Sequence, residues 1–316
     1  MELDSKYSKK IGNILANISE EDRAVFTTKK FAGSYQLPVL IKKLRNLALY
    51  DLYADRMKGI YMKRAIVVAV ITFAITFLIF FSFAGGFIAR KSLFLAFFLP
   101  LFLVLASIVL VRKSKTLKKN DLNNEFRNFL VPLFATLGED IMPKSKVFVD
   151  AIFDAPMQDK YSIGEKKPGS DFELFVKAAQ NPNKSGKSIY NYHQNWITAN
   201  MLFVDQVHLS FVIERAGSKI YSTKKRSSGK VKTKSKTKMR INIHLQMLVP
   251  KSHYKKSGQL ARSKDARHSM QMNLEDQDGN LLIKAKYKRK GMPNDRLSVQ
   301  EFLSLIRAMY ATIQPI

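Results

Sequence analysis

The residues with the most regular spacing for chemistry are basic. Positions 215 to 240 hold eleven Lys or Arg residues and no acidic residue, and from Lys230 to Arg240 a basic residue occupies every other position. Cationic side chains at this density attract phosphate groups, as in anionic lipids or nucleic acid. We therefore predict a lipid- or polyanion-binding segment made of Arg215, Lys219, Lys224, Lys225, Arg226, Lys230, Lys232, Lys234, Lys236, Lys238 and Arg240.

Three interpretations of this basic run remain open. It can attach to an anionic leaflet, bind nucleic acid, or form a solvated loop without a specific partner, with a mobile tip near Ser227 and Gly229. Base stacking needs aromatic side chains, and Tyr221 is the only one in the run. The alternating positions also match the polar side of the strand expected at 239–249, so that strand is predicted to extend back into the run with its basic face outward.

Other residue types that support catalysis or metal binding form no motif. The five histidines are scattered, and none has a metal-ligand spacing. His208 and His244 fall on strands that can be neighbours, where a polar cross-strand pair is favoured over a metal site. Ser185 to Ser188 resembles the end of a phosphate-binding loop, but the glycine required at position 181 is Asn. There is no cysteine. We predict no catalytic residue, cofactor or metal, and we do not expect an enzyme.

The apolar residues are concentrated in one region. Residues 65–88 contain no charge in 24 positions, and 92–111 form a second uncharged run of 20. A helix of 24 residues spans about 36 Å, enough to cross a bilayer core of about 30 Å. We predict a membrane protein with a two-helix transmembrane hairpin. The alternatives are a hairpin buried in a soluble core and a re-entrant hairpin.

The orientation of this hairpin follows from the basic residues at its ends. Nine Lys or Arg residues flank the outer ends of the two runs, and only Arg90 and Lys91 lie in the connection. Basic residues favour the cytoplasmic side. The first 20 residues hold no apolar stretch of signal-peptide length. We therefore expect a protein of the plasma (inner) membrane with both termini in the cytoplasm.

Residues 1–64 are predicted to form a cytoplasmic helical segment. Gly33 and Ser34 suggest a break, and Pro38 suits the first turn of a helix with an apolar stripe. This helix is expected to pack on the C-terminal domain, or alternatively to lie along the membrane or in a self-association face. It can also continue into the first apolar run.

Residues 120–316 are predicted to form a cytoplasmic α+β domain with an antiparallel sheet. We expect a helix over 120–137, a helix or strand over 147–153 and a short element over 172–179. Alternating apolar residues predict strands over 201–214 and 239–249, and a hairpin joins 270–275 to 281–287 through Asp278 and Gly279. Ser298 and Glu301 form a capping box that opens a final helix.

The order of these features resembles the DUF3137 family of bacterial membrane proteins. The similarity lies in FRNFLVPLFATLGEDIMPKSKVFVDAIFD after the hairpin and in VDQVHLSFVIERAGSKIYS and MRINIHLQMLV around the basic run. It covers about residues 60 to 255 and is mainly one of layout. The family's acidic, glycine-containing segment and its aromatic-rich second strand are not clearly present. The resemblance implies a membrane location and this fold, and no activity.

Together these features predict a membrane-anchored, non-enzymatic scaffold or interaction protein. Its formal charge of +28, from 53 basic and 25 acidic residues, favours anionic partners. Its basic cytoplasmic domain would contact a protein partner, a second copy of the chain, or anionic lipid. The alternatives are a membrane-tethered nucleic-acid-binding protein and an enzyme of unrecognised type.

Overall fold

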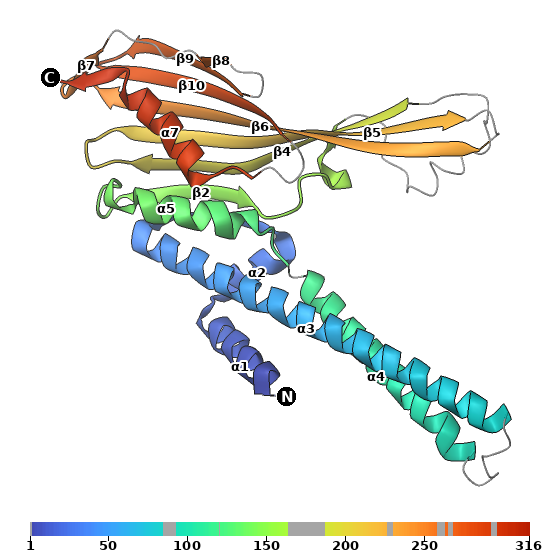
Figure 1. The fold of residues 1–316 in the computed structure, drawn as a ribbon. Helices are drawn as coiled ribbons and strands as arrows, with labels where there is room; N and C mark the ends of the chain where they lie inside the picture. The colour runs from blue at the N-terminus through green and yellow to red at the C-terminus, as the bar shows by residue number, and fades with distance from the viewer. Residues whose placement is uncertain are drawn as a thin grey trace. The chain divides into compact units, whose positions relative to one another are not determined.

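The computed structural model describes residues 2–84, 93–119, 121–163, 187–225, 230–257, 263–264, 268–291 and 296–316 (Figure 1). The chain divides into two compact units. The first contains Met1–Thr28 and Lys43–Leu122, and the second contains Lys29–Lys42 and Asn123–Ile316. The predicted connection at Arg90 and Lys91 and the predicted element at 172–179 lie outside the described residues.

The first unit is helical. It contains α1 (Glu2–Asn17), α2 (Glu20–Thr28), most of α3 (Leu37–Ala84) and α4 (Leu93–Lys119). The continuous α3 confirms that the helix near Pro38 runs into the first apolar segment. The hydroxyls of Ser107 and Ser114 reach the carbonyls of Ala65 and Lys58, both at 3.4 Å. Later residues of α4 therefore lie beside earlier residues of α3, and the two helices are antiparallel.

Among the described residues, α3 is the one helix that is long and apolar enough to cross a membrane, by length and composition. Only 11% of its most apolar window is buried. A helix in the core of a soluble protein would have this surface covered.

The second unit is built on an antiparallel sheet, as predicted. The strand order is β1-β2-β4-β5-β6-β10-β9-β8, with β3 paired to β4, and β7 (Tyr254–Lys256) pairs separately with β11 (Ile313–Pro315). The strands of the main sheet are β1 (Lys30–Gln36), β2 (Lys146–Ile152), β3 (Ser162–Ile163), β4 (Lys187–Leu202), β5 (His208–Lys225), β6 (Val231–Pro250), β8 (Ser263–Lys264), β9 (His268–Gln277) and β10 (Asn280–Gly291).

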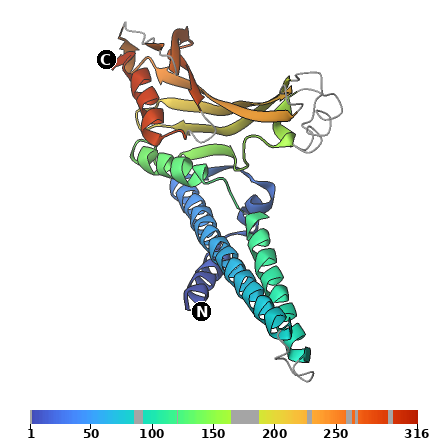
Figure 2. The ribbon, with the colours of Figure 1, turned by 45° about the vertical axis from the view of Figure 1, so that its right-hand side comes forward.

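One face of this sheet carries the core of the second unit. Helices η2 (Phe126–Leu130), α5 (Val131–Thr136) and α7 (Val299–Tyr310) contribute apolar side chains to it, and Figures 1 and 2 show α7 lying across the strands. Phe302 packs edge-on against Phe211 of β5 at 4.8 Å between ring centroids. Phe129 lies 5.4 Å from Trp196 of β4. The helices therefore cover one face of the strands and leave the alternate side chains on the other.

Three predicted elements were wrong in type or extent. Residues 30–36, expected within a helical segment, form edge strand β1, whose Phe31 is buried. The single strand expected over 201–214 is two strands, because the chain turns between Phe203 and Val207 with Gln206 at φ 65°. The helix expected from Asn120 begins only at Phe126, and the part of β4 before Met201 was not predicted.

Three short predictions in the second unit were more accurate. The segment at 147–153 is strand β2, and the turn at Asp278 and Gly279 joins β9 to β10. The hydroxyl of Ser298 accepts the N–H of Glu301 at 3.0 Å and caps α7. The Glu301 carboxylate binds Tyr287 and Arg289 of β10, so this acidic residue ties the helix to the sheet.

Candidate functional site

The predicted basic segment is a strand for most of its length. β6 begins at Val231, which confirms that the strand extends back into the basic run. Met239 and Ile241 are buried on the helix side, while the alternating basic residues between Lys232 and Arg240 are exposed. This arrangement follows from the two-residue period of a strand, which sends successive side chains to opposite faces.

Strand β10 adds a second row of cations that was not predicted. Lys286, Lys288 and Lys290 are exposed. In the register of β10 with β6, these three lysines lie opposite His244, Asn242 and Arg240 respectively. The sequence does contain the signal, because these lysines alternate with the buried Ala285 and Tyr287.

Together the two strands make a cationic surface, here called the basic face. Strands pair about 4.8 Å apart and side chains on one face repeat about every 6.8 Å, so neighbouring cations lie close enough to sum their potentials. Within the described residues, no member of the basic face forms an ion pair. Its members are Lys232, Lys234, Lys236, Lys238, Arg240, Lys286, Lys288 and Lys290.

Arg215 does not belong to this surface, contrary to prediction. Its side chain is 2% exposed, its Cζ lies 3.4 Å from the ring centroid of Trp196, and it pairs with Glu125. Burial lowers the pKa of the Arg215 guanidinium to about 9. The physical reason is the alternation of side chains along a strand. Phe211, Ile213 and Arg215 occupy alternate positions of β5, so all three point to the buried helix side.

The remaining residues of the predicted basic segment lie in different surroundings. Lys219 is half-buried, with its Nζ 5.9 Å from the ring centroid of Tyr192, on the helix side of β5. Lys224 and Lys225 lie in β5, and Arg226 lies outside the described residues. Lys230 is exposed just before β6.

A histidine pair does lie on the same open face, but not the predicted one. His208 pairs with Leu248 and His244 with Val212, so these two histidines are not opposite each other. Instead His193 and His244 approach Glu214 from either side, at 3.4 and 3.7 Å. The sequence did not indicate this grouping because the part of β4 that carries His193 was not predicted.

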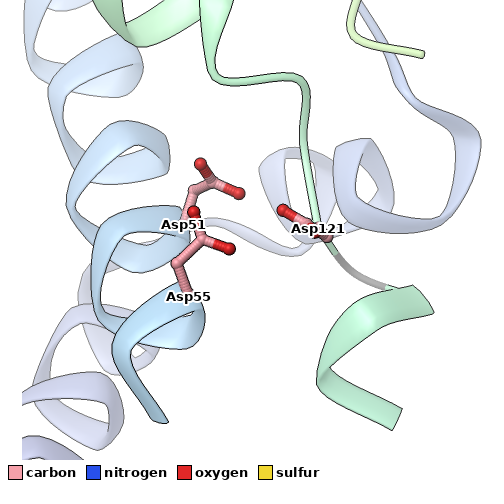
Figure 3. Close-up of side chains that lie close together, drawn as sticks. All are labelled: Asp51, Asp55 and Asp121. Carbon is pink, nitrogen blue, oxygen red and sulfur yellow. The ribbon is translucent and has the colours of Figure 1, made fainter. Parts of the chain in front are cut away.

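A cluster of three carboxylates lies in the helical unit (Figure 3). Oxygens of Asp51, Asp55 and Asp121 lie within 4.8 Å of one another. The Lys58 ammonium lies 2.8 Å from Asp55 and 2.7 Å from Asp121, and Asp51 accepts the N–H of Leu122 at 2.8 Å. The pKa of Lys58 is raised overall. Burial lowers it, but the hydrogen bonds to Asp121 and Asp55 outweigh the effect of burial. Lys58 therefore serves as the counter-ion in a network that fastens α3 to the residues after α4.

Comparisons with known proteins give no family. No family model matches the chain, and neither the curated proteins nor the solved structures contain a match. The resemblance to the DUF3137 family therefore stays a prediction.

Proposed function

We propose that this chain is a non-enzymatic membrane-anchored protein whose basic face binds the headgroups of anionic phospholipids. The observation that carries the proposal is the basic face itself: eight exposed cations on two neighbouring strands, without an ion-pair partner among the described residues. Each Lys or Arg close to an anionic leaflet contributes about 1 kcal/mol.

The anchor in this proposal is a two-span hairpin made of α3 and α4. It is supported by large apolar side chains that project from both helices. Phe73 and Phe80 of α3 are 73% and 67% exposed, and Phe102 of α4 is 70% exposed. Exposing apolar surface to water is unfavourable by about 25 cal/mol per Å². Lipid removes this penalty, and the antiparallel packing of α3 and α4 suits two crossings.

The orientation in this proposal is the predicted one, with both termini in the cytoplasm. Lys63 and Arg64 precede the apolar part of α3, and Arg112 and Lys113 follow that of α4. Basic residues at these ends favour the cytoplasmic side. The cytoplasmic leaflet is also the one with the negative surface potential, so the anchor places the basic face in the same compartment as its proposed ligand.

The basic face fits a lipid surface better than nucleic acid. Single-stranded nucleic acid is usually bound by aromatic side chains that stack on bases. From Lys232 to Gln246 in β6 and from Lys284 to Lys290 in β10, the positions on this face carry Lys, Arg, Asn, His and Gln. The aromatic residue of these two strands, Tyr287, points to the helix side. A row of ammonium and guanidinium groups on one face can contact lipid phosphates, and needs no base contacts.

The test is lysine footprinting of the full chain in nanodiscs. The protein is reconstituted in neutral phosphatidylcholine discs and in discs with phosphatidylglycerol, and acetylation rates are measured by mass spectrometry. Lys286, Lys288 and Lys290 are expected to react several-fold more slowly in the anionic discs. Exposed lysines elsewhere in the second unit, Lys42, Lys144 and Lys255, serve as the matched control and are expected to react alike in both.

If acetylation of both lysine sets slows equally in the anionic discs, the proposal is contradicted. General attraction of a cationic protein to the anionic discs would then explain the slower acetylation. Protection of the basic face by an added oligonucleotide in neutral discs, with none from anionic lipid, would instead favour nucleic-acid binding. That competition should be run at several salt concentrations, since phosphate contacts weaken steeply with salt.

A further inference from the structure

An acidic groove lies at one end of the sheet, away from the basic face. It has a volume of about 600 Å³ and is formed by the end of α5 and η3 (Leu137–Glu139), the β4–β5 turn, and α7. Leu137, Phe203 and Ile306 give it an apolar floor. Glu139, Asp140 and Asp205 line it as well, against a single cation among its lining residues, Arg307.

The carboxylate of Asp205 is held in place by the fold. Its Oδ2 accepts the hydroxyls of Tyr254 and Tyr310 at 2.8 and 2.9 Å, and its Oδ1 accepts the N–H of Val207 at 3.2 Å. Asp205 therefore provides a fixed negative charge. Glu139 and Asp140 are exposed, and no hydrogen bond or ion pair within the described residues engages their carboxylates. These two carboxylates remain available to a partner.

The opposite end of the same sheet is strongly cationic. The β5–β6 hairpin continues beyond β10, which pairs with β6 only from Met239 onward, and β4 pairs alongside β5 as far as Ser222 (Figure 1). In this extension Lys232, Lys234 and Lys236 are exposed. Ile220, which lies opposite Lys236, is half-exposed and supplies an apolar side chain beside the cations.

The hairpin cannot reach the groove of its own chain. The groove lies at the start of β5 and the hairpin at its end. At about 3.3 Å per residue, the length of this strand separates them by about 60 Å. A contact between the two surfaces must therefore join different copies of the chain.

We propose that the acidic groove receives the basic β5–β6 hairpin of a second copy. Lys232 and Lys234 would face Glu139 and Asp140, and Ile220 would approach the apolar floor. The contact is head-to-tail, with different surfaces on the two partners, so it repeats along a row of molecules instead of closing as a symmetric dimer. Fixing one unit of each copy to a membrane confines such a row to a plane. This inference goes beyond lipid binding and does not depend on it.

The charges predict how the contact responds to salt. The whole chain carries +28, so copies repel one another at long range, while the groove and the hairpin attract at short range. Interactions between exposed charges are largely screened beyond about 10 Å at 0.1 M salt and beyond about 3 Å at 1 M. Association is therefore expected at moderate salt and is lost at high salt, where the short-range pairs are screened as well.

The test uses two neutralised variants of the full chain in detergent micelles, with particle masses measured across a concentration series. One variant, Glu139→Gln/Asp140→Asn, removes charge from the groove. The other, Lys232→Gln/Lys234→Gln, removes it from the hairpin. Each is expected to lower the self-association constant by roughly 10-fold or more relative to the unsubstituted chain.

Mixing the two variants gives the decisive result. The groove variant retains an intact hairpin and the hairpin variant retains an intact groove, so one contact can form and the mixture should stop at dimers. The unsubstituted chain should continue to larger species. No dimer in the mixture, or unchanged association of either variant alone, would overturn the proposal, as would an unsubstituted chain that stays monomeric at all salt concentrations tested.

This outcome is separable from that of lipid binding. The groove variant, Glu139→Gln/Asp140→Asn, changes no member of the basic face, so the protection of Lys286, Lys288 and Lys290 in anionic nanodiscs should persist when self-association is lost. Loss of both in this one variant would indicate misfolding, which the fluorescence of Trp196, the chain's single tryptophan, detects directly.

Discussion

The guanidinium of Arg215 lies over the indole of Trp196, with 3.4 Å between its Cζ and the ring centroid. Both side chains are almost fully buried, and Glu125 supplies the counter-charge. Desolvation of the cation opposes folding, while the cation–π contact and the ion pair offset it. A residue from the most basic segment of the sequence thus serves the core of the second unit.

Removing the Arg215 side chain should destabilise the second unit strongly. Arg215→Ala leaves the Glu125 carboxylate without its cation and opens a cavity beside Trp196, with an expected loss of about 3–5 kcal/mol. Urea unfolding followed by Trp196 fluorescence measures it. The double variant Arg215→Met/Glu125→Leu removes both charges and keeps the volume, so it should recover most of the loss. A double variant as unstable as Arg215→Ala would show that the charges themselves are needed.

The lysine in the carboxylate cluster should be needed for the helical unit. Lys58→Gln leaves Asp51, Asp55 and Asp121 with oxygens within 4.8 Å of one another and removes the ammonium that bonds Asp55 and Asp121. Loss of charged hydrogen bonds of this kind is expected to cost about 1.5–3 kcal/mol. Thermal unfolding followed by circular dichroism at 222 nm measures it in micelles. Adding Asp121→Asn should restore part of the stability by relieving the repulsion, and no restoration would argue against a repulsive origin.

Alkaline pH should weaken the region around Asp205. Burial raises the pKa of Tyr254 to about 12, with the hydrogen bond to Asp205 adding to it, and burial raises the pKa of Tyr310 well above the usual range. An unfolded tyrosine titrates near pH 10. Between pH 10 and 12 the unfolded chain releases protons that the folded chain retains, so stability falls as pH rises through this window.

The measurement is urea unfolding at pH 9, 10 and 11. The double variant Tyr254→Phe/Tyr310→Phe lacks both titrating hydroxyls, so its unfolding midpoint should decline less steeply over this range. Deprotonation of lysines affects both proteins equally, which makes the difference in slope the informative quantity. Parallel slopes would mean that these two phenols do not account for alkaline destabilisation.

Alternation of side chains allowed much of the basic face to be predicted, because Lys232 to Arg240 share a parity with the polar side of β6. The same rule, applied one strand further back, places Arg215 with Phe211 and Ile213 on the buried side. The three lysines of β10 also follow it. The information was present in each strand, but grouping the lysines required the β6–β10 register, which depends on contacts distant in sequence.

The missed strands have a different cause. β4 contains Asn191, Gln194 and Asn195 among its apolar residues, and its buried Gln194 breaks the alternation that identifies a strand. β1 contains Gly33, where an added Cβ would lie 2.5 Å from the ring of Tyr35. Pairing with β2 along its whole length makes this segment a strand, although glycine lowers the local strand preference. The acidic groove could not be predicted from local patterns either, since it combines residues from three segments that are distant in sequence.

Two glycine substitutions should have opposite effects on stability. Gly279 has φ 78° in the β9–β10 turn, a conformation that an L-residue adopts at a cost of about 1–2 kcal/mol. Gly279→Ala should therefore destabilise the hairpin by about that amount, although its Cβ would meet no atom within 4 Å. Gly59 also has open space around its Cβ position, but it lies inside α3, where alanine is favoured over glycine by about 1 kcal/mol. Gly59→Ala should raise the thermal unfolding temperature, and Gly279→Ala should lower it. Because neither substitution creates a clash, the difference isolates backbone conformation, and a shift of both variants in the same direction would contradict the φ-based explanation.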